Sequence, residues 1–211
     1  MLARRKFMTA VLPLCLFLLA GYGGIYSPAQ AQENEQHARS FIDSLAGDAI
    51  KALTAPGTTD ETRSEHFRRL LNDNFAVKTI ARWVLGRHWK KATKDERAEY
   101  LDLFEELLIV TYVSRFSSYS GEKLEIEKTV ANGKNDVTVY TSIIRDNSQP
   151  PLHVDWRVRN RKNTLKVIDV IVEGVSMGQT QRSEFASVIR RNGGKVEGLL
   201  AVLRKRVSKS T

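Results

Sequence analysis

The residue types that most often carry chemistry are few in this chain and lie far apart along it. The four histidines are His37, His66, His88 and His153. No two of them are spaced to place both imidazoles on one helical face, as a metal site would need. The chain has no G-x-S-x-G nucleophile elbow and no glycine-rich phosphate loop. We therefore predict no catalytic histidine or serine, no metal and no cofactor.

One carboxylate remains a candidate for catalysis. Asp169 interrupts an otherwise apolar strand at residues 167–171. A buried carboxylate can act as a general base, as in small isomerases built on a cone-shaped sheet. The alternative is that Asp169 accepts structural hydrogen bonds near a strand or a bulge. We favour the structural role, because no partner acid or oxyanion donor can be identified beside it.

The N-terminus has the pattern of a cleavable export signal. Residues 4–6 are basic, residues 8–20 are mostly apolar, and residues 29–31 read Ala-Gln-Ala, a small-x-small cleavage pattern. The apolar run is about half of the roughly 20 residues that cross a bilayer. We predict a signal peptide at residues 1–31 and a periplasmic mature protein, residues 32–211. The paired arginines also fit twin-arginine export, although a general secretory signal can look the same.

Composition limits the mature protein further. Its 180 residues suit a single domain with a hydrophobic core. Cys15 is the only cysteine and lies in the signal, which excludes disulfides and thiol chemistry from the mature chain. The signal holds three of the 33 basic residues, leaving 30 against 24 acidic residues, a net charge of +6. For an exported protein this charge favours anionic lipid headgroups or an acidic protein partner over nucleic acid.

The first half of the chain has a helical pattern. Apolar residues recur at helical spacing over residues 42–53, and Pro56-Gly57 ends that helix. Asp60 is the expected cap of a second helix, and residues 75–89 form a third. Thr93 and Glu96 form a capping box for a long helix through residue 119.

That long helix is apolar on nearly all sides over residues 107–113. A helix at a protein surface shows a single apolar stripe, so this segment should be covered on more than one side. It is either an ordinary core helix or a helix between the core and a cavity.

The second half changes to the two-residue period of β-strands. Residues 123–126, 136–145, 152–159 and 165–173 are the expected strands, and two short helices separated by Gly193-Gly194 end the chain. Val154, Trp156 and Val158 alternate with polar residues, so they should face the helices. The predicted class is α+β, with helices covering one face of a curved antiparallel sheet.

Three stretches resemble the toluene-tolerance family of periplasmic phospholipid-binding proteins, the soluble carrier of the maintenance-of-lipid-asymmetry pathway. They are residues 84–100, with VLGRHWKKAT followed by Glu96, Arg97 and Tyr100; residues 111–122, an aromatic helix end; and residues 169–177, DVIVEGVSM, followed by Arg182 and Phe185. The resemblance runs from about residue 67 to residue 203. Two departures bear on the size and lip of the pocket: Ile168 stands where the family often has an aromatic residue, and Gly178 where a bulkier one is common.

The resemblance implies a cone-shaped fold related to the nuclear-transport-factor-2 group, with an N-terminal helical layer and two C-terminal helices. It also implies a monomeric carrier, not an enzyme, that holds acyl chains between helices and sheet. Its implied partners are phospholipid, an outer-membrane lipoprotein–porin complex and an inner-membrane ATP-driven lipid permease, with transient membrane proximity. A relative that binds hopanoids, an enzyme using Asp169 and a structural envelope adaptor remain the alternatives.

Nine apolar residues are the expected lining of the lipid pocket, and each of them could equally be ordinary core. The long helix contributes one group, the preceding helix Trp83, and the sheet the rest. They are Trp83, Phe104, Leu108, Tyr112, Phe116, Val139, Val154, Trp156 and Val158.

Overall fold

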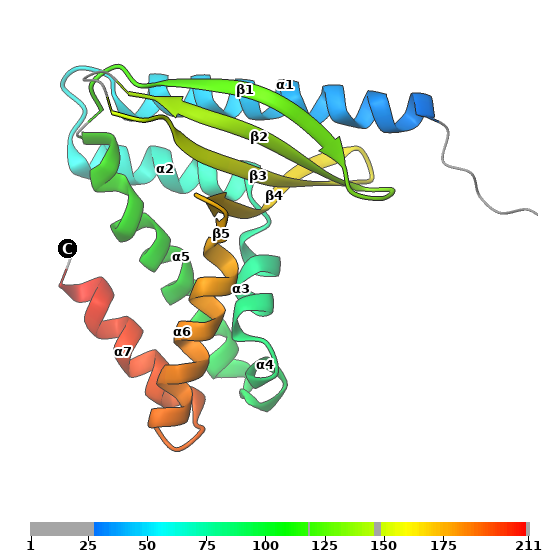
Figure 1. The fold of residues 1–211 in the computed structure, drawn as a ribbon. Coiled ribbons are helices and arrows are strands. Elements are labelled where there is room, and N and C mark those ends of the chain that lie inside the picture. The colour runs from blue at the N-terminus through cyan, green and yellow to red at the C-terminus, as the bar shows by residue number, and fades with distance from the viewer. Residues whose placement is uncertain (1–27, 118, 146–148, 210–211) are drawn as a thin grey trace, which may run out of the picture.

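The computed structural model describes residues 28–117, 119–145 and 149–209. The proposed signal at residues 1–31 therefore falls mostly outside the described residues, and its cleavage site lies in the first turn of helix α1. Figure 1 shows a curved sheet with two long helices along it, and a group of further helices that extends away from the sheet.

The helices and strands follow the order expected from the sequence. They are α1 (Pro28–Leu53), α2 (Asp60–Asn74), α3 (Val77–Leu85), α4 (His88–Lys91), α5 (Lys94–Ser117), β1 (Lys123–Ala131), β2 (Asp136–Ile144), β3 (Leu152–Arg161), β4 (Thr164–Val172), β5 (Val175–Ser176), α6 (Met177–Arg191) and α7 (Val196–Ser208). The α+β class, the antiparallel sheet and the two C-terminal helices are confirmed.

The strands form one antiparallel sheet in the order β1-β2-β3-β4-β5. Trp156 on β3 lies opposite Val139 on β2 and Val170 on β4, so these side chains share a face. Register shifts interrupt β1–β2 pairing beside Glu127 and β3–β4 pairing beside Ile168. Such bulges increase local twist and bend the strand, which accounts for the curvature in Figure 1.

Helix α1 covers the apolar face of the sheet and also protects its edge. The edge strand β1 would otherwise present unpaired backbone groups to other chains. Glu35 accepts a hydrogen bond from the Ala131 amide at 2.8 Å, and Arg39 donates to the Ile126 carbonyl at 3.1 Å. Side chains of α1 therefore occupy hydrogen-bonding positions that a further strand would use.

Most of the buried apolar residues belong to one of two clusters. The sheet core joins α1 to the sheet through Ala38, Ile42, Leu45, Val137, Val139, Val158 and Val167. The helix core joins α2, α3, α5, α6 and α7, with Tyr100, Phe104 and Phe185 at its centre. Figure 1 shows the same division as a sheet layer and a group of helices that extends from it.

Two helix boundaries differ from the sequence prediction. Helix α2 is capped by Thr59, whose side chain accepts from the Thr62 amide, and Asp60 is instead its first residue. The helix predicted over residues 75–89 is broken at Gly86, which has a φ of 57°. A Cβ at that position would lie 3.2 Å from the Arg182 guanidinium, so both backbone and space require glycine there.

The capping box at the start of α5 is confirmed. The Glu96 amide donates to Thr93 Oγ1 at 3.1 Å, and the Thr93 amide donates to Glu96 Oε2 at 2.8 Å. Thr93→Ala removes the first of these bonds and should lower the free energy of unfolding by about 1 kcal/mol. Urea denaturation measures the change; Thr93→Ser is the matched control, because serine also caps helices and should restore most of the loss.

Candidate functional site

The candidate site is the boundary between the sheet core and the helix core, here called the seam. Phe75 is half-buried and packs against both cores. Its ring meets the Trp156 indole edge-on, with 6.5 Å between centroids. The adjacent Ala76 amide donates to the Val167 carbonyl at 2.9 Å, which fixes this turn to strand β4. The seam is therefore apolar and lined by large, partly exposed rings.

Helix α2 runs along this boundary, and its side chains pack on both sides of it. Leu70 packs against the sheet core, whereas the next residue, Leu71, belongs to the helix core. Phe67 packs against the helix core and contacts Phe116 near the end of α5, with 5.9 Å between ring centroids. The same helix thus contributes side chains to each core.

The apolar segment of α5 is covered on several sides, as expected. Leu107, Ile109 and Val113 are buried, and Leu108 and Tyr112 are half-buried. The helix packs mainly against α2 and α7 and less against α1 and α3. Among the described elements, no strand packs extensively against it. The helix is therefore held chiefly by other helices, and the sheet is held chiefly by α1.

The nine residues predicted to line the pocket fall into different parts of this arrangement. Phe104 is a member of the helix core and Leu108 packs against it. Val139 and Val158 are fully buried in the sheet core, and Trp156 packs against it. Tyr112 and Phe116 are half-buried on α5. The structure thus brings these residues to two cores and does not gather them around one cavity.

Val154 and Trp83 belong to neither core. Val154 is only 5% exposed but belongs to neither core, although it lies on the same strand face as Trp156 and Val158. Trp83 is 44% exposed on α3, where the Arg182 guanidinium stacks over its ring at 5.0 Å. Val154 is therefore buried outside both cores, whereas Trp83 lies on the outer surface.

Polar groups next to the apolar residues are bonded within the protein. The Trp156 indole N–H donates to Thr141 Oγ1 at 3.2 Å, and Thr141 donates to the Val154 carbonyl. The Tyr100 hydroxyl donates to the Ala81 carbonyl at 2.9 Å, and burial raises the pKa of Tyr100. None of these groups is presented as a nucleophile or a base.

The Asp169 carboxylate is likewise hydrogen-bonded within the protein. Its carboxylate accepts from Ser176 Oγ at 2.7 Å and from the Gly178 and Val170 amides at 3.1 and 3.0 Å. Arg157 Nη1 lies 3.7 Å away. The carboxylate follows the β4 bulge and holds the start of α6, which agrees with the structural role favoured from the sequence. A Cβ on Gly178 would lie 3.1 Å from both Asp169 Oδ1 and the Trp83 ring, so this close approach depends on glycine.

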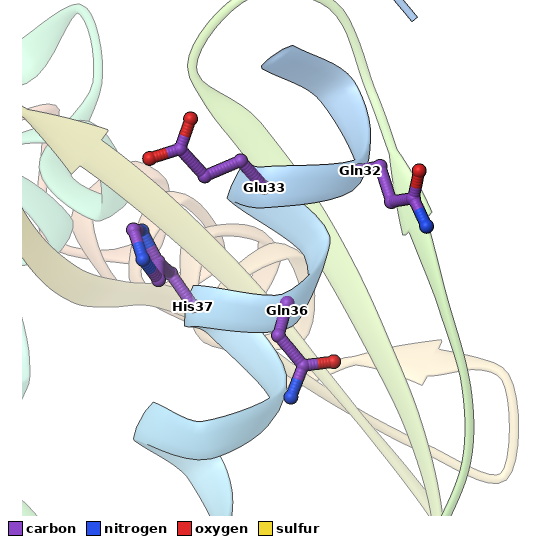
Figure 2. A pocket seen from close by; sticks show the side chains of 4 residues that line it. All are labelled: Gln32, Glu33, Gln36 and His37. Atoms are coloured by element: carbon purple, nitrogen blue, oxygen red, sulfur yellow. The ribbon is translucent and has the colours of Figure 1, made fainter. Parts of the chain in front are cut away.

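Two surface depressions away from the seam are lined by polar residues. One, of about 380 Å³, is lined by Gln32, Glu33, Gln36 and His37 on α1. Figure 2 shows these four side chains pointing away from the helix in different directions. The other, of about 460 Å³, lies between the hairpin turns around residues 132–136 and 159–161. None of the nine predicted lining residues borders either depression, and neither is suited to acyl chains.

Residues 28–117, 119–145 and 149–209 contain neither a cluster of metal-ligating side chains nor a helix that could cross a membrane. No three His, Cys, Asp or Glu side chains in these ranges are grouped so that they could hold a metal ion. No helix in the same ranges combines the length and the apolar character that crossing a membrane requires.

The sequence did not identify Phe75 as the residue that joins the two cores. It was expected only as a buried position on a helix, but it follows the last residue of α2 and forms an isolated bridge with Val167. The Phe67–Phe116 contact was also missed, because it joins residues 49 positions apart on separate helices. Neither residue stands out in sequence from other core aromatics.

The model of the MlaC protein family matches residues 43–205 of this chain. The chain belongs to the MlaC protein family. The matched range includes residues 43–53 of α1, all of α2 to α6, all five strands, and most of α7. The toluene-tolerance resemblance noted in the sequence is thereby confirmed.

Individual relatives of this MlaC-family chain agree with the assignment. It is 28% identical over 113 residues to the intermembrane phospholipid transport system binding protein MlaC of Haemophilus influenzae, covering 52% of this chain and 53% of that protein. It is 22% identical over 111 residues to the toluene tolerance protein ttg2D of Pseudomonas putida, covering 53% and 51%. The aligned segment thus spans about half the length of these curated relatives.

A solved structure shares the fold. The phospholipid-binding protein of Ralstonia solanacearum, determined in complex with a phospholipid, superposes with a TM-score of 0.74 at 24% sequence identity. The match covers 82% of this chain and 98% of that one. The arrangement of sheet and helices is therefore that of a known protein fold.

Proposed function

We propose that this protein is a periplasmic lipid carrier that holds phospholipid acyl chains at the seam and shuttles the lipid between outer-membrane and inner-membrane complexes. The observation that carries the proposal is the division of the apolar interior into two cores that share Phe75. A protein of this size could bury the same side chains in one core. Two cores with half-buried rings between them provide a boundary into which apolar chains can insert.

The energetics favour such a shield. Two acyl chains hold about 30 methylene groups, and burial of each is worth about 0.8 kcal/mol. A lipid that left a membrane uncovered would lose that stabilisation, so transfer through water needs a protein surface to replace it. Binding of this kind needs no reactive side chain, which agrees with the internally bonded Asp169 and Tyr100.

The seam would accept acyl chains by rearrangement of its aromatic side chains. Phe67, Phe75 and Trp156 are all half-buried and meet their neighbours at ring edges or tilted angles. Rotation of such rings exposes apolar surface without breaking a hydrogen-bonded strand or helix. Of the nine predicted lining residues, we propose Val154, Trp156, Leu108, Tyr112 and Phe116 as the lipid contacts, because Phe104, Val139 and Val158 belong to the interiors of the cores and Trp83 lies outside.

Family membership and the relatives support the remaining parts of the proposal. The phospholipid in the Ralstonia solanacearum structure and the transport role in the name of the Haemophilus influenzae protein support phospholipid as cargo. We propose export through the signal at residues 1–31, a single mature domain at residues 32–211, and transfer between an outer-membrane lipoprotein–porin complex and an inner-membrane ATP-driven permease. An intermembrane transport role requires a carrier in the space between the membranes.

Solvent extraction of the purified protein, followed by mass spectrometry, tests the cargo. We expect two-chain phospholipid at close to one molecule per protein. The matched control is the same protein unfolded, stripped of lipid and refolded, which should be empty until it is mixed with vesicles. An empty native protein that also stays empty with vesicles would contradict the carrier and favour a structural adaptor, and hopanoid in place of phospholipid would reassign the cargo.

A further inference from the structure

Six cations gather at the end of the helices that lies farthest from the sheet. Three come from the segment around α4 and three from the turn between α6 and α7, both at that end in Figure 1. They are Arg87, Lys90, Lys91, Arg190, Arg191 and Lys195, here called the basic tip. All six are exposed, and none is in an ion pair with a described residue.

The two segments lie at the same end of the molecule, because α3, which leads into α4, packs against α6 (Figure 1). His88 is 6% exposed, and neither of its ring nitrogens has a hydrogen-bond partner among the described residues. Burial lowers the pKa of His88, and the positive charges of Arg87, Lys91 and Arg190 lower it further. Arg190 on α6 therefore lies close enough to α4 for its charge to act on the same imidazole as those of Arg87 and Lys91.

The basic tip holds as many cations as the net positive charge of the mature chain. After residue 31 the sequence has 30 basic and 24 acidic residues. Without the six tip residues, 24 basic residues balance 24 acidic ones. Nearby acids are already engaged: Glu197 and Glu99 pair with Arg204, and Glu96 accepts from the Thr93 amide. Asp95 is a further exposed acid next to this region.

Favourable interaction with helix dipoles explains only part of this charge. Arg190 and Arg191 are in the last turn of α6, where a cation favours the helix dipole. Lys195, however, is the N-cap of α7 and makes no side-chain capping bond. A cation at a helix N-terminus interacts unfavourably with the helix dipole. Lys195 therefore makes the helix less stable than Asp, Ser or Asn would at the same position.

The composition of the basic tip fits a lipid surface better than a protein. Stable protein interfaces have a buried core with aromatic or apolar anchors. The large apolar side chains exposed on the described part of the chain are Trp83, Val130 and Val175, and none belongs to the basic tip. Flexible cations without an apolar anchor match a surface of many similar negative charges, such as an anionic lipid leaflet.

We propose that the basic tip docks the protein, reversibly and without insertion, onto a membrane surface that carries anionic phospholipid headgroups. The contact brings a lipid carrier to the surface where its cargo enters or leaves, but it does not depend on the cargo site. The attraction is screened within about 8 Å at physiological ionic strength, so the contact forms and breaks easily.

Cosedimentation with vesicles tests the proposal at low ionic strength. The probes are vesicles of phosphatidylglycerol mixed with phosphatidylcholine, and vesicles of phosphatidylcholine alone. Two tip variants, Arg190→Gln/Arg191→Gln/Lys195→Gln and Arg87→Gln/Lys90→Gln/Lys91→Gln, each remove three charges. The matched control, Lys134→Gln/Arg161→Gln/Lys162→Gln, removes three exposed charges from the hairpin turns of the sheet. Thermal unfolding of each variant verifies that it is folded.

We expect the parent protein to bind the anionic vesicles and not the neutral ones. Each tip variant should bind about 100-fold more weakly, because each cation near an anionic leaflet contributes about a fivefold gain in affinity. The control should keep its affinity. Equal losses in all variants would show an effect of net charge alone, and no binding by the parent would also overturn the proposal. Tip-dependent binding to soluble poly-glutamate, without vesicle binding, would assign the basic tip to an acidic protein instead.

Failure here would be distinguishable from failure of the carrier function. Lipid extraction reports on the seam and vesicle binding on the basic tip. A protein that contains phospholipid but ignores anionic vesicles is a carrier without this docking surface. An empty protein that still binds them through the basic tip has the docking surface without the cargo.

Discussion

Val158→Asp should abolish the folded state. Val158 is fully buried in the sheet core, opposite Val137 on β2 and Val167 on β4. An unpaired carboxylate there has no polar partner, and burying such a charge costs about 4 kcal/mol or more. That is a large part of the roughly 5–15 kcal/mol that stabilises a domain. Circular dichroism and urea denaturation should show a mostly unfolded protein.

Val154→Asp, four residues earlier on the same face of the strand, should behave differently. Val154 is buried but belongs to neither core. If it lines the seam, an introduced carboxylate can be hydrated once acyl chains are absent, whereas a packed core cannot admit water. We expect a folded protein that contains at least about tenfold less phospholipid, since a charge against an acyl chain costs more than 1.4 kcal/mol.

The two variants must be compared for fold and lipid content on the same samples. Val154→Ala and Val158→Ala are the controls, because they remove volume without adding charge. If both Asp variants unfold to the same extent, Val154 is ordinary core and the lipid contacts lie elsewhere on the seam. If Val154→Asp stays folded and keeps its phospholipid, Val154 does not line the site.

Asp169→Ala should be the most destabilising change outside the apolar cores. It removes the acceptor of the Ser176 hydroxyl and of the Gly178 amide, which together hold the start of α6 against β4. Hydrogen bonds to a charged group contribute about 1.5–3 kcal/mol, and buried donors left without a partner add to the cost. We expect the free energy of unfolding to fall by about 3 kcal/mol in urea denaturation.

Asp169→Asn is the matched control, because it keeps the shape and one carbonyl oxygen. That oxygen can still accept from the Gly178 amide, so a loss of about 1 kcal/mol is expected. Phospholipid content per folded molecule should be unchanged in both variants, as Asp169 bonds to backbone and serine rather than to the seam. A stability of Asp169→Ala equal to that of the parent would contradict the structural role and restore Asp169 as a candidate base.

The sequence was sufficient for features that depend on near neighbours along the chain. The faces of Val154, Trp156 and Val158 followed from alternation, because a strand places successive side chains on opposite sides. The Thr93–Glu96 capping box followed from residues three positions apart. The order of helices and strands was also predictable, since each has its own apolar period and its own breakers.

Only the tertiary structure decided how these elements share their apolar surface. Periodicity indicates that Phe104 and Val139 are both buried, but it cannot assign them to separate cores, because that depends on which helix covers which strand. The helical period predicted that Trp83 is buried. In the structure Trp83 is exposed, and its ring is covered on one side by Arg182, a residue 99 positions away. Contacts between distant segments decide which core a residue joins and whether it is covered. A local sequence pattern holds no information on those contacts. The seam and the basic tip both arise from contacts of this kind.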